Sequence, residues 1–467
     1  NALGSATFGQ FSYIQQFFNQ VVTFLDGGVS TAFFTKLSAR PNRVGLIRFL
    51  FFFSVIVFLV IFAAVFSAQL IGVTSLIFPD TPINFIYFGA LLGFLLWFSQ
   101  VCIKVSDAYL LTVSVESLKV VYKLLSLGLL ALLILLTNFN LTIYFYFHFI
   151  SLFFFITAII FISVKKGVIV KDVWFSRLDY RLLLREFYLY VYPLFTFNSL
   201  AIVISIFDIW LLRYISGPIQ TGFYAIAYAI SALSILFTSA ITQVISRDFS
   251  NSFARNNINN IKKLYQNYVP MLYTISAYFG VLLAFHSEQI LNIFYDVEFR
   301  EAYFVLIVMS FYPLHQTFGQ LNTSVFLSTE KTRMYKNIGI FSILIGLLMS
   351  FTFVYKLEMG AIGFAWKMVL GQLIGVNIQL YFISSLLRLA FIDYLKFQIS
   401  TLLFFFIIAY IGSSIDILIN SIFYKFIFEF VFYTIISTLS VIIFPSIFGL
   451  KRNFLKNFFY NITKNSK

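Results

Sequence analysis

Residues 127–136 read LGLLALLILL, and this run decides the fold class. It lies inside a longer apolar segment, 110–137, and about a dozen similar segments recur along the chain. A helix that crosses a bilayer needs about 20 mostly apolar residues. A spanning barrel strand alternates in polarity over about ten residues, and residues 127–136 do not alternate. The pattern therefore predicts an all-α polytopic membrane protein.

About thirteen membrane-spanning helices are expected from the lengths of these segments. The expected spans are 9–35, 46–71, 83–103, 110–137, 141–164, 187–214, 219–246, 264–286, 302–328, 337–356, 360–387, 396–416 and 424–449.

Basic residues fall on alternate connections between these spans. Of the 32 Lys and Arg residues, 27 lie in the connections on one side, in adjoining segment ends or in the carboxy-terminal tail. Cytoplasmic loops of membrane proteins carry this excess. We therefore interpret the net charge of +14 as the excess of basic residues that orients the protein in the membrane, with additional contacts to anionic lipid headgroups. We do not interpret it as a sign of nucleic-acid binding.

This orientation places Asn1 outside the membrane and the carboxy terminus in the cytoplasm. We expect one more helix, entering from the cytoplasm, to precede Asn1 in the gene product. About fourteen helices would then cross the membrane.

An internal repeat indicates two lobes. The stretch from Gly4 through Gly9 to Phe11 and the stretch from Gly217 through Gly222 to Tyr224 share one pattern, each at the outer start of a segment that runs inward. A repeat with one orientation implies two bundles related by an axis along the membrane normal. The expected parts are an amino-terminal lobe lacking its first helix (1–164), a cytoplasmic connector (165–186), a second lobe (187–390), two extra transmembrane helices (391–450) and a basic cytoplasmic tail (451–467).

Groups that support catalysis or metal binding are sparse. Cys102 is the single cysteine, the three histidines have no ligand spacing, and no P-loop occurs. We therefore expect no enzyme activity, no metal and no cofactor.

Several short stretches resemble bacterial polysaccharide (O-antigen) flippases of the Wzx type, within the multidrug/oligosaccharidyl-lipid/polysaccharide exporter superfamily. These stretches are 3–12, 25–32, 192–193, 208–212, 222–225, 294–302 and 360–365. The resemblance implies two six-helix lobes in pseudo-twofold repeat plus two carboxy-terminal helices. It also implies translocation of undecaprenyl-pyrophosphate-linked oligosaccharide by alternating access across the bacterial inner membrane. Lipopolysaccharide biosynthesis, with a polysaccharide polymerase and chain-length proteins as partners, would be the setting.

Such a cargo has an anionic headgroup, so we predict that a basic residue inside the membrane binds the substrate. Lys367 lies about 10 Å into its span, and Gly363, Gly371 and Gly375 share its face as a small-residue stripe. Lys367 either faces cargo or snorkels to the outer interface.

Two aspartates also lie in expected spans. Asp208 is expected at a similar depth, and three interpretations stay open: a counter-ion for Lys367, a cation or proton site, or a residue facing a wet crevice. Asp26 precedes Gly27 and Gly28, which loosen a helix, so we interpret this group as gate or packing residues.

A polar stripe occupies the span 302–328. Gln316, Gln320 and Thr323 form the stripe, with His315 and Asn322 beside it. These side chains either bind sugar hydroxyls or make hydrogen bonds between helices, and the second use is favoured.

Two other functions stay open. A drug or small-cation exporter of the same fold would favour acidic groups in the cavity. A membrane glycosyltransferase or polysaccharide polymerase would be expected to carry a large outer loop, and only a modest acidic loop, 287–301, is present.

Overall fold

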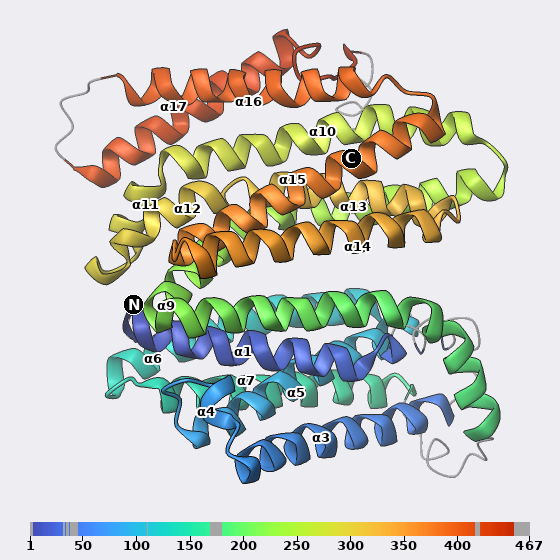
Figure 1. Cartoon of the computed structure of the whole chain (residues 1–467), viewed down its shortest axis with the longest axis vertical. Coiled ribbons are helices and arrows are strands. Elements are labelled where there is room, and N and C mark those ends of the chain that lie inside the picture. Colours follow the sequence, from blue (N-terminus) through green and yellow to red (C-terminus); the bar gives the residue numbers. More distant parts are fainter. Residues whose placement is uncertain are drawn as a thin grey trace. The chain divides into compact units, whose positions relative to one another are not determined.

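The computed structural model describes residues 3–30, 33, 37, 45–109, 111–168, 180–415 and 421–452. Every regular element among these residues is a helix (Figure 1). Ten helices in this part of the chain are long and apolar enough to cross a membrane. The all-α prediction is confirmed. The described residues belong to two compact units, 1–222 and 223–467, while the lobe boundaries expected from the charge pattern stay a prediction.

The first unit is built around one central helix. Its elements are α1 (Gly4–Asp26), α3 (Gly45–Ile71), α4 (Thr74–Ile77), α5 (Ile83–Ala108), α6 (Thr112–Leu136), α7 (Leu141–Lys165) and the first part of α9 (Tyr180–Ala254). Helix α5 packs against α1, α3 and α7, and α6 packs on α7. The leucine-rich run in α6 is largely exposed. An exposed apolar face of this kind suits contact with lipid.

The second unit contains the rest of α9 and ten shorter elements. They are α10 (Ile258–Phe285), α11 (Ser287–Phe294), η1 (Val297–Ala302), α12 (Tyr303–Met309), α13 (Tyr312–Ser328), α14 (Thr332–Met349), η2 (Ser350–Lys356), α15 (Gly360–Leu387), α16 (Phe391–Ser413) and α17 (Ile422–Ile443), followed by a turn segment to 450. Helix α15 packs against α12, α13 and α14, while α10 packs against α13 and α16. Helix α17 packs against α16.

Four expected spans differ from the helices observed. Helix α1 ends at Asp26 and not near 35, because Gly27 and Gly28 take left-handed φ values of 53° and 91°. The spans 187–214 and 219–246 lie in the single element α9, whose backbone leaves helical geometry at Gly217. The span 302–328 is divided between α12 and α13. Ten long apolar helices remain of the thirteen expected spans, because two spans share α9, α13 has only 17 residues, and α1 falls outside the set.

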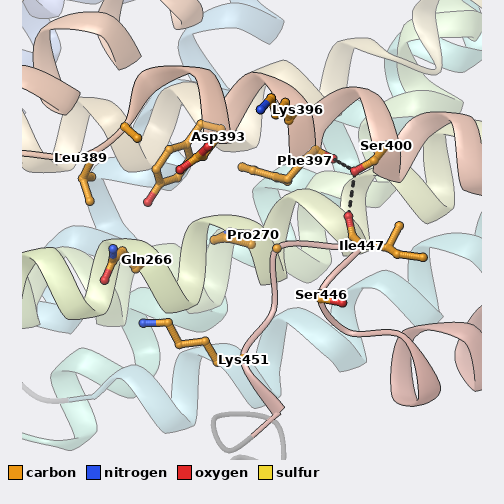
Figure 2. Close-up of a pocket in the computed structure, with 13 residues that line it drawn as sticks. Gln266, Pro270, Leu389, Asp393, Lys396, Phe397, Ser400, Ser446, Ile447 and Lys451 are labelled. Atoms are coloured by element: carbon orange, nitrogen blue, oxygen red, sulfur yellow. Dashed lines mark hydrogen bonds between the residues drawn. The ribbon is translucent and has the colours of Figure 1, made fainter.

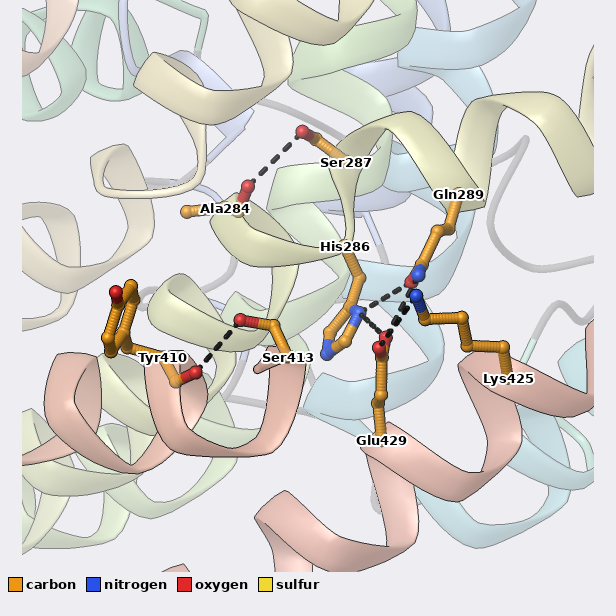
Figure 3. A network of polar contacts seen from close by, with 8 residues as sticks. All are labelled: Ala284, His286, Ser287, Gln289, Tyr410, Ser413, Lys425 and Glu429. Carbon is orange, nitrogen blue, oxygen red and sulfur yellow. Dashed lines mark hydrogen bonds and ion pairs between the residues drawn. The ribbon is translucent and has the colours of Figure 1, made fainter. Parts of the chain in front are cut away.

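A buried polar network anchors α17 in the second unit (Figure 3). The amide Nε2 of Gln289 in α11 donates to Glu429 Oε2 in α17 at 2.9 Å. His286 Nδ1 lies 2.6 Å from Gln289 Oε1 and 3.4 Å from Glu429 Oε2. The Glu429 side chain is only 4% exposed. A buried carboxylate needs such partners to offset its desolvation, so the network fixes α17 to the end of α10 and to α11.

Candidate functional site

Lys367 is a buried cation near the start of α15. Its helix begins at Gly360, and the residue is 9% exposed. The ammonium group lies 5.2 Å from the centre of the Phe364 ring, within cation–π range. A Cβ added to Gly346 of α14 would lie 3.5 Å from Lys367 Cε. The Lys367 stem therefore runs beside α14, where a glycine leaves room for it.

Two of the three glycines that share a face with Lys367 lie close to a neighbouring element, η2 or α14. A Cβ on Gly363 would lie 3.0 Å from the carbonyl oxygen of Phe353 in η2. A Cβ on Gly375 would lie 2.9 Å from the hydroxyl of Ser342 in α14. Gly371 differs, because a Cβ there would meet nothing within 4 Å. The stripe thus combines close helix contact at two positions with open space at a third.

The polar residues of α13 divide into two groups. Asn322 is fully buried, accepts a hydrogen bond from the Tyr265 hydroxyl at 2.6 Å and donates to the Val376 carbonyl at 3.2 Å. Gln316 accepts from Gln372 of α15 at 3.0 Å. Both side chains therefore make hydrogen bonds between helices.

His315 and Gln320 keep unused polar atoms among the described residues. His315 is 5% exposed, and its Nδ1 has no hydrogen-bond partner in this part of the chain. Gln320 is half-buried, and its side chain makes no hydrogen bond to another described residue. A buried polar atom without a hydrogen-bond partner is destabilising, which distinguishes His315 from Asn322.

Asp26 is enclosed by hydrogen-bond donors at the end of α1. Its carboxylate accepts from the backbone amides of Gly28 and Ser30 at 3.2 and 3.1 Å, from the Ser30 hydroxyl at 3.0 Å and from the Trp97 indole at 3.2 Å. Lys104 in turn donates to the Ser30 hydroxyl at 2.8 Å. These contacts close the turn through Gly27 and join α1 to α5.

Asp208 is buried in α9 with 5% exposure. It belongs to the first unit, whereas Lys367 belongs to the second. Their pairing stays a prediction.

Arg213 lies in α9, five residues beyond Asp208 and at the outer end of the expected span 187–214. It is 3% exposed and donates from Nη2 to the Pro79 carbonyl at 3.1 Å. Its Nε and Nη1 atoms have no hydrogen-bond partner among the described residues. A basic residue at the end of an expected span is visible in the sequence. The burial of Arg213, however, depends on the loop after α4, which the sequence does not identify as its neighbour.

No family model matches the chain. A probable low-salt glycan biosynthesis flippase, Agl15 of Haloferax volcanii, is 24% identical over 207 residues. That match covers 42% of this chain and 43% of the relative, so the chain aligns with less than half of that protein.

Solved transporter structures are similar over most of the chain. An inward-facing multidrug resistance MATE family transporter of the MOP superfamily has a TM-score of 0.67 at 14% identity, covering 82% of this chain and 91% of the other. The lipid II flippase MurJ in an inward closed conformation has a TM-score of 0.63 at 15% identity, covering 94% and 93%. At such identities the similarity concerns architecture. The chain has the fold that the MATE and MurJ transporters share.

Proposed function

We propose that this protein is a flippase that moves undecaprenyl-pyrophosphate-linked oligosaccharides across the bacterial cytoplasmic membrane by alternating access. The observation that carries the proposal is the buried ammonium group of Lys367 in α15. A cation in a low-dielectric site attracts an anionic headgroup far more strongly than it does in water. The partial match to a probable glycan biosynthesis flippase supports the same cargo class.

The other site residues receive roles that follow from their contacts. His315 and Gln320 are proposed to form hydrogen bonds with sugar hydroxyls, because His315 Nδ1 and the Gln320 side chain make no hydrogen bond to another described residue. Gln316 and Asn322 are proposed to hold α13 in place beside them. Asp208 is proposed as a buried polar group of the first unit that contributes to the cargo path.

The gate and packing roles fall on a carboxylate and several glycines. Asp26, Gly27 and Gly28 are proposed to set the end of α1, where the carboxylate holds the turn. Gly363 and Gly371 are proposed to let α15 move against α14 and η2, since neither carries a side chain that would interlock. A polysaccharide polymerase and chain-length proteins are the proposed downstream partners.

The direct test is transport in proteoliposomes that contain the purified chain and a fluorescent lipid-linked oligosaccharide. Chemical quenching of the outer leaflet measures the fraction flipped with time. The proposal predicts a flipping rate above that of protein-free vesicles and inhibition by excess unlabelled pyrophosphate-linked lipid. A rate equal to that of empty vesicles, with folded protein present, contradicts it.

A drug or small-cation exporter is the second proposal. Buried carboxylates at Asp26 and Asp208 favour it, as does the MATE-type fold. Asp26, however, already accepts hydrogen bonds from Ser30 and Trp97. Its carboxylate oxygens therefore have fewer free lone pairs with which to bind a cation. Uptake of a fluorescent cationic dye by the same proteoliposomes, without any flipping of the lipid-linked sugar, would establish this alternative.

A further inference from the structure

A pocket of about 440 Å³ opens at one end of the second unit (Figure 2). Its walls come from α10, from the start of α16 and from residues 444–451, which follow α17 and are called the strap here. This is the end at which α10, α14 and α16 begin, and the positive-inside pattern assigns it to the cytoplasmic face. The pocket therefore lies where headgroups of the inner leaflet are expected.

The strap is fixed against the helices. Ser400 of α16 donates to the Ile447 carbonyl at 2.8 Å. Phe448 is fully buried, and its ring centre lies 5.3 Å from that of Phe405. Gly449 adopts φ 66°, and a Cβ there would lie 3.2 Å from the Phe397 ring. Its close backbone approach and left-handed conformation require glycine at this position. The pocket wall is therefore a packed part of the unit.

The lining combines cations with an apolar wall. Lys396 of α16 and Lys451 of the strap are both exposed, and both line the pocket. Asp393 is the one carboxylate among the lining residues, so the lining has a net positive charge. Pro270, Phe397 and Ile447 supply the apolar part. An amphiphile with a single negative charge at its polar end matches this combination.

We propose that this pocket binds the phosphate of an anionic glycerophospholipid from the cytoplasmic leaflet. The two ammonium groups attract the phosphodiester, as basic pockets between transmembrane helices do for lipid headgroups. The apolar wall contacts the first carbons of the acyl chains. Inorganic phosphate fits less well, because its second negative charge is repelled by Asp393 and it gains nothing from Pro270 or Phe397. This inference does not depend on which cargo the protein carries.

The test measures lipid binding to the purified full chain by native mass spectrometry during titration with phosphatidylglycerol. A double variant, Lys396→Gln with Lys451→Gln, is expected to bind about thirtyfold more weakly, since each of the two basic residues near an anionic surface contributes on the order of 1 kcal/mol. The matched control is Lys263→Gln with Lys336→Gln. It removes the same charge from exposed residues at the same end of α10 and α14 that do not line the pocket.

A second variant tests the contribution of the pocket's shape separately from that of its charge. Ser446→Phe places a large side chain at an exposed lining position without changing any charge, and it is expected to reduce phosphatidylglycerol binding as well. Thermal melting in detergent verifies that each variant is folded. An equal loss of binding in the control pair, or no loss in either pocket variant, overturns the proposal. Displacement of the lipid by millimolar inorganic phosphate also overturns it, because the site would then belong to the free ion.

Discussion

Gly9 of α1 and Gly222 of α9 approach each other backbone to backbone inside the first unit. A Cβ added to Gly9 would overlap the Pro218 carbonyl oxygen and lie 2.7 Å from the Gly222 amide nitrogen. A Cβ added to Gly222 would in turn overlap the Ser5 carbonyl oxygen. These are the second glycines of the two repeated motifs. The repeat therefore marks a crossing at which neither helix has room for a side chain.

Replacing either glycine by alanine should destabilise the protein. The added methyl group meets backbone atoms, which cannot rotate away, so a cost of about 1–3 kcal/mol or more is expected. Thermal melting of the detergent-purified chain, followed by fluorescence-detected gel filtration, measures the effect. Gly128→Ala in α6 is the control, because a Cβ there meets nothing within 4 Å. Equal melting temperatures for Gly9→Ala, Gly222→Ala and Gly128→Ala would show that the crossing is looser than described.

The sequence predicts the helices well because each one needs a long apolar run, whatever its neighbours are. The exposed leucines of α6 illustrate this, since lipid contact demands only apolar character. Contacts between helices cannot be predicted in this way. Lys367 lies beside Gly346, and nothing in the spacing of either helix identifies that neighbour.

The buried polar groups show the same limit. Glu429 lies inside the expected span 424–449, and an intramembrane carboxylate signals that a partner exists. Its partners His286 and Gln289 are about 140 residues away, so the partner's identity requires the fold. For the end of α1 the sequence does carry a local signal, because Gly27 and Gly28 are adjacent and both take left-handed φ, although the expected span continued to 35.

The His286–Glu429 network predicts a pH dependence of stability. Burial lowers the pKa of His286 below its ordinary value, although the Gln289 hydrogen bond and the Glu429 charge oppose that shift. Lys425, 4.0 Å from Glu429, is the other charged group in the network. The unfolded chain therefore binds a proton near pH 6.5 that the folded protein resists. Stability from neutral His286 is complete above that pH and is lost as the pH falls toward the lowered folded pKa.

Melting temperatures between pH 7.5 and pH 5 measure this dependence. In His286→Asn the part of the decline that His286 causes should disappear, so its curve should be flatter than that of the original chain. Parallel curves for the two proteins would assign the pH dependence to other groups. Glu429→Ala should lower stability at every pH, because the half-buried Gln289 amide loses its hydrogen bond to a carboxylate, a bond that contributes about 1.5–3 kcal/mol.

Lys367→Ala should reduce flipping of the lipid-linked oligosaccharide by about 10- to 100-fold, since a hydrogen bond to a charged group contributes about 1.5–3 kcal/mol. Lys367→Arg should retain part of the rate, because the charge remains while the geometry changes. Initial rates in proteoliposomes with matched amounts of protein measure both. Lys356→Ala, at an exposed position in η2, is the control. A full rate in Lys367→Ala would return this residue to a purely interfacial role.

Asn322 and Gln320 lie on the same helix and should respond in opposite ways. Asn322→Ala leaves the fully buried Tyr265 hydroxyl without its acceptor, so stability should fall by about 1–3 kcal/mol. Gln320→Ala removes no hydrogen bond made by its side chain among the described residues, so its melting temperature should stay near that of the original chain. If Gln320 meets sugar hydroxyls, its variant should nevertheless flip cargo more slowly. Melting curves and flipping rates on the same preparations separate the two roles. A stable Asn322→Ala, or a Gln320→Ala that flips at the full rate, would show that the division of α13 into packing and cargo-facing residues is wrong.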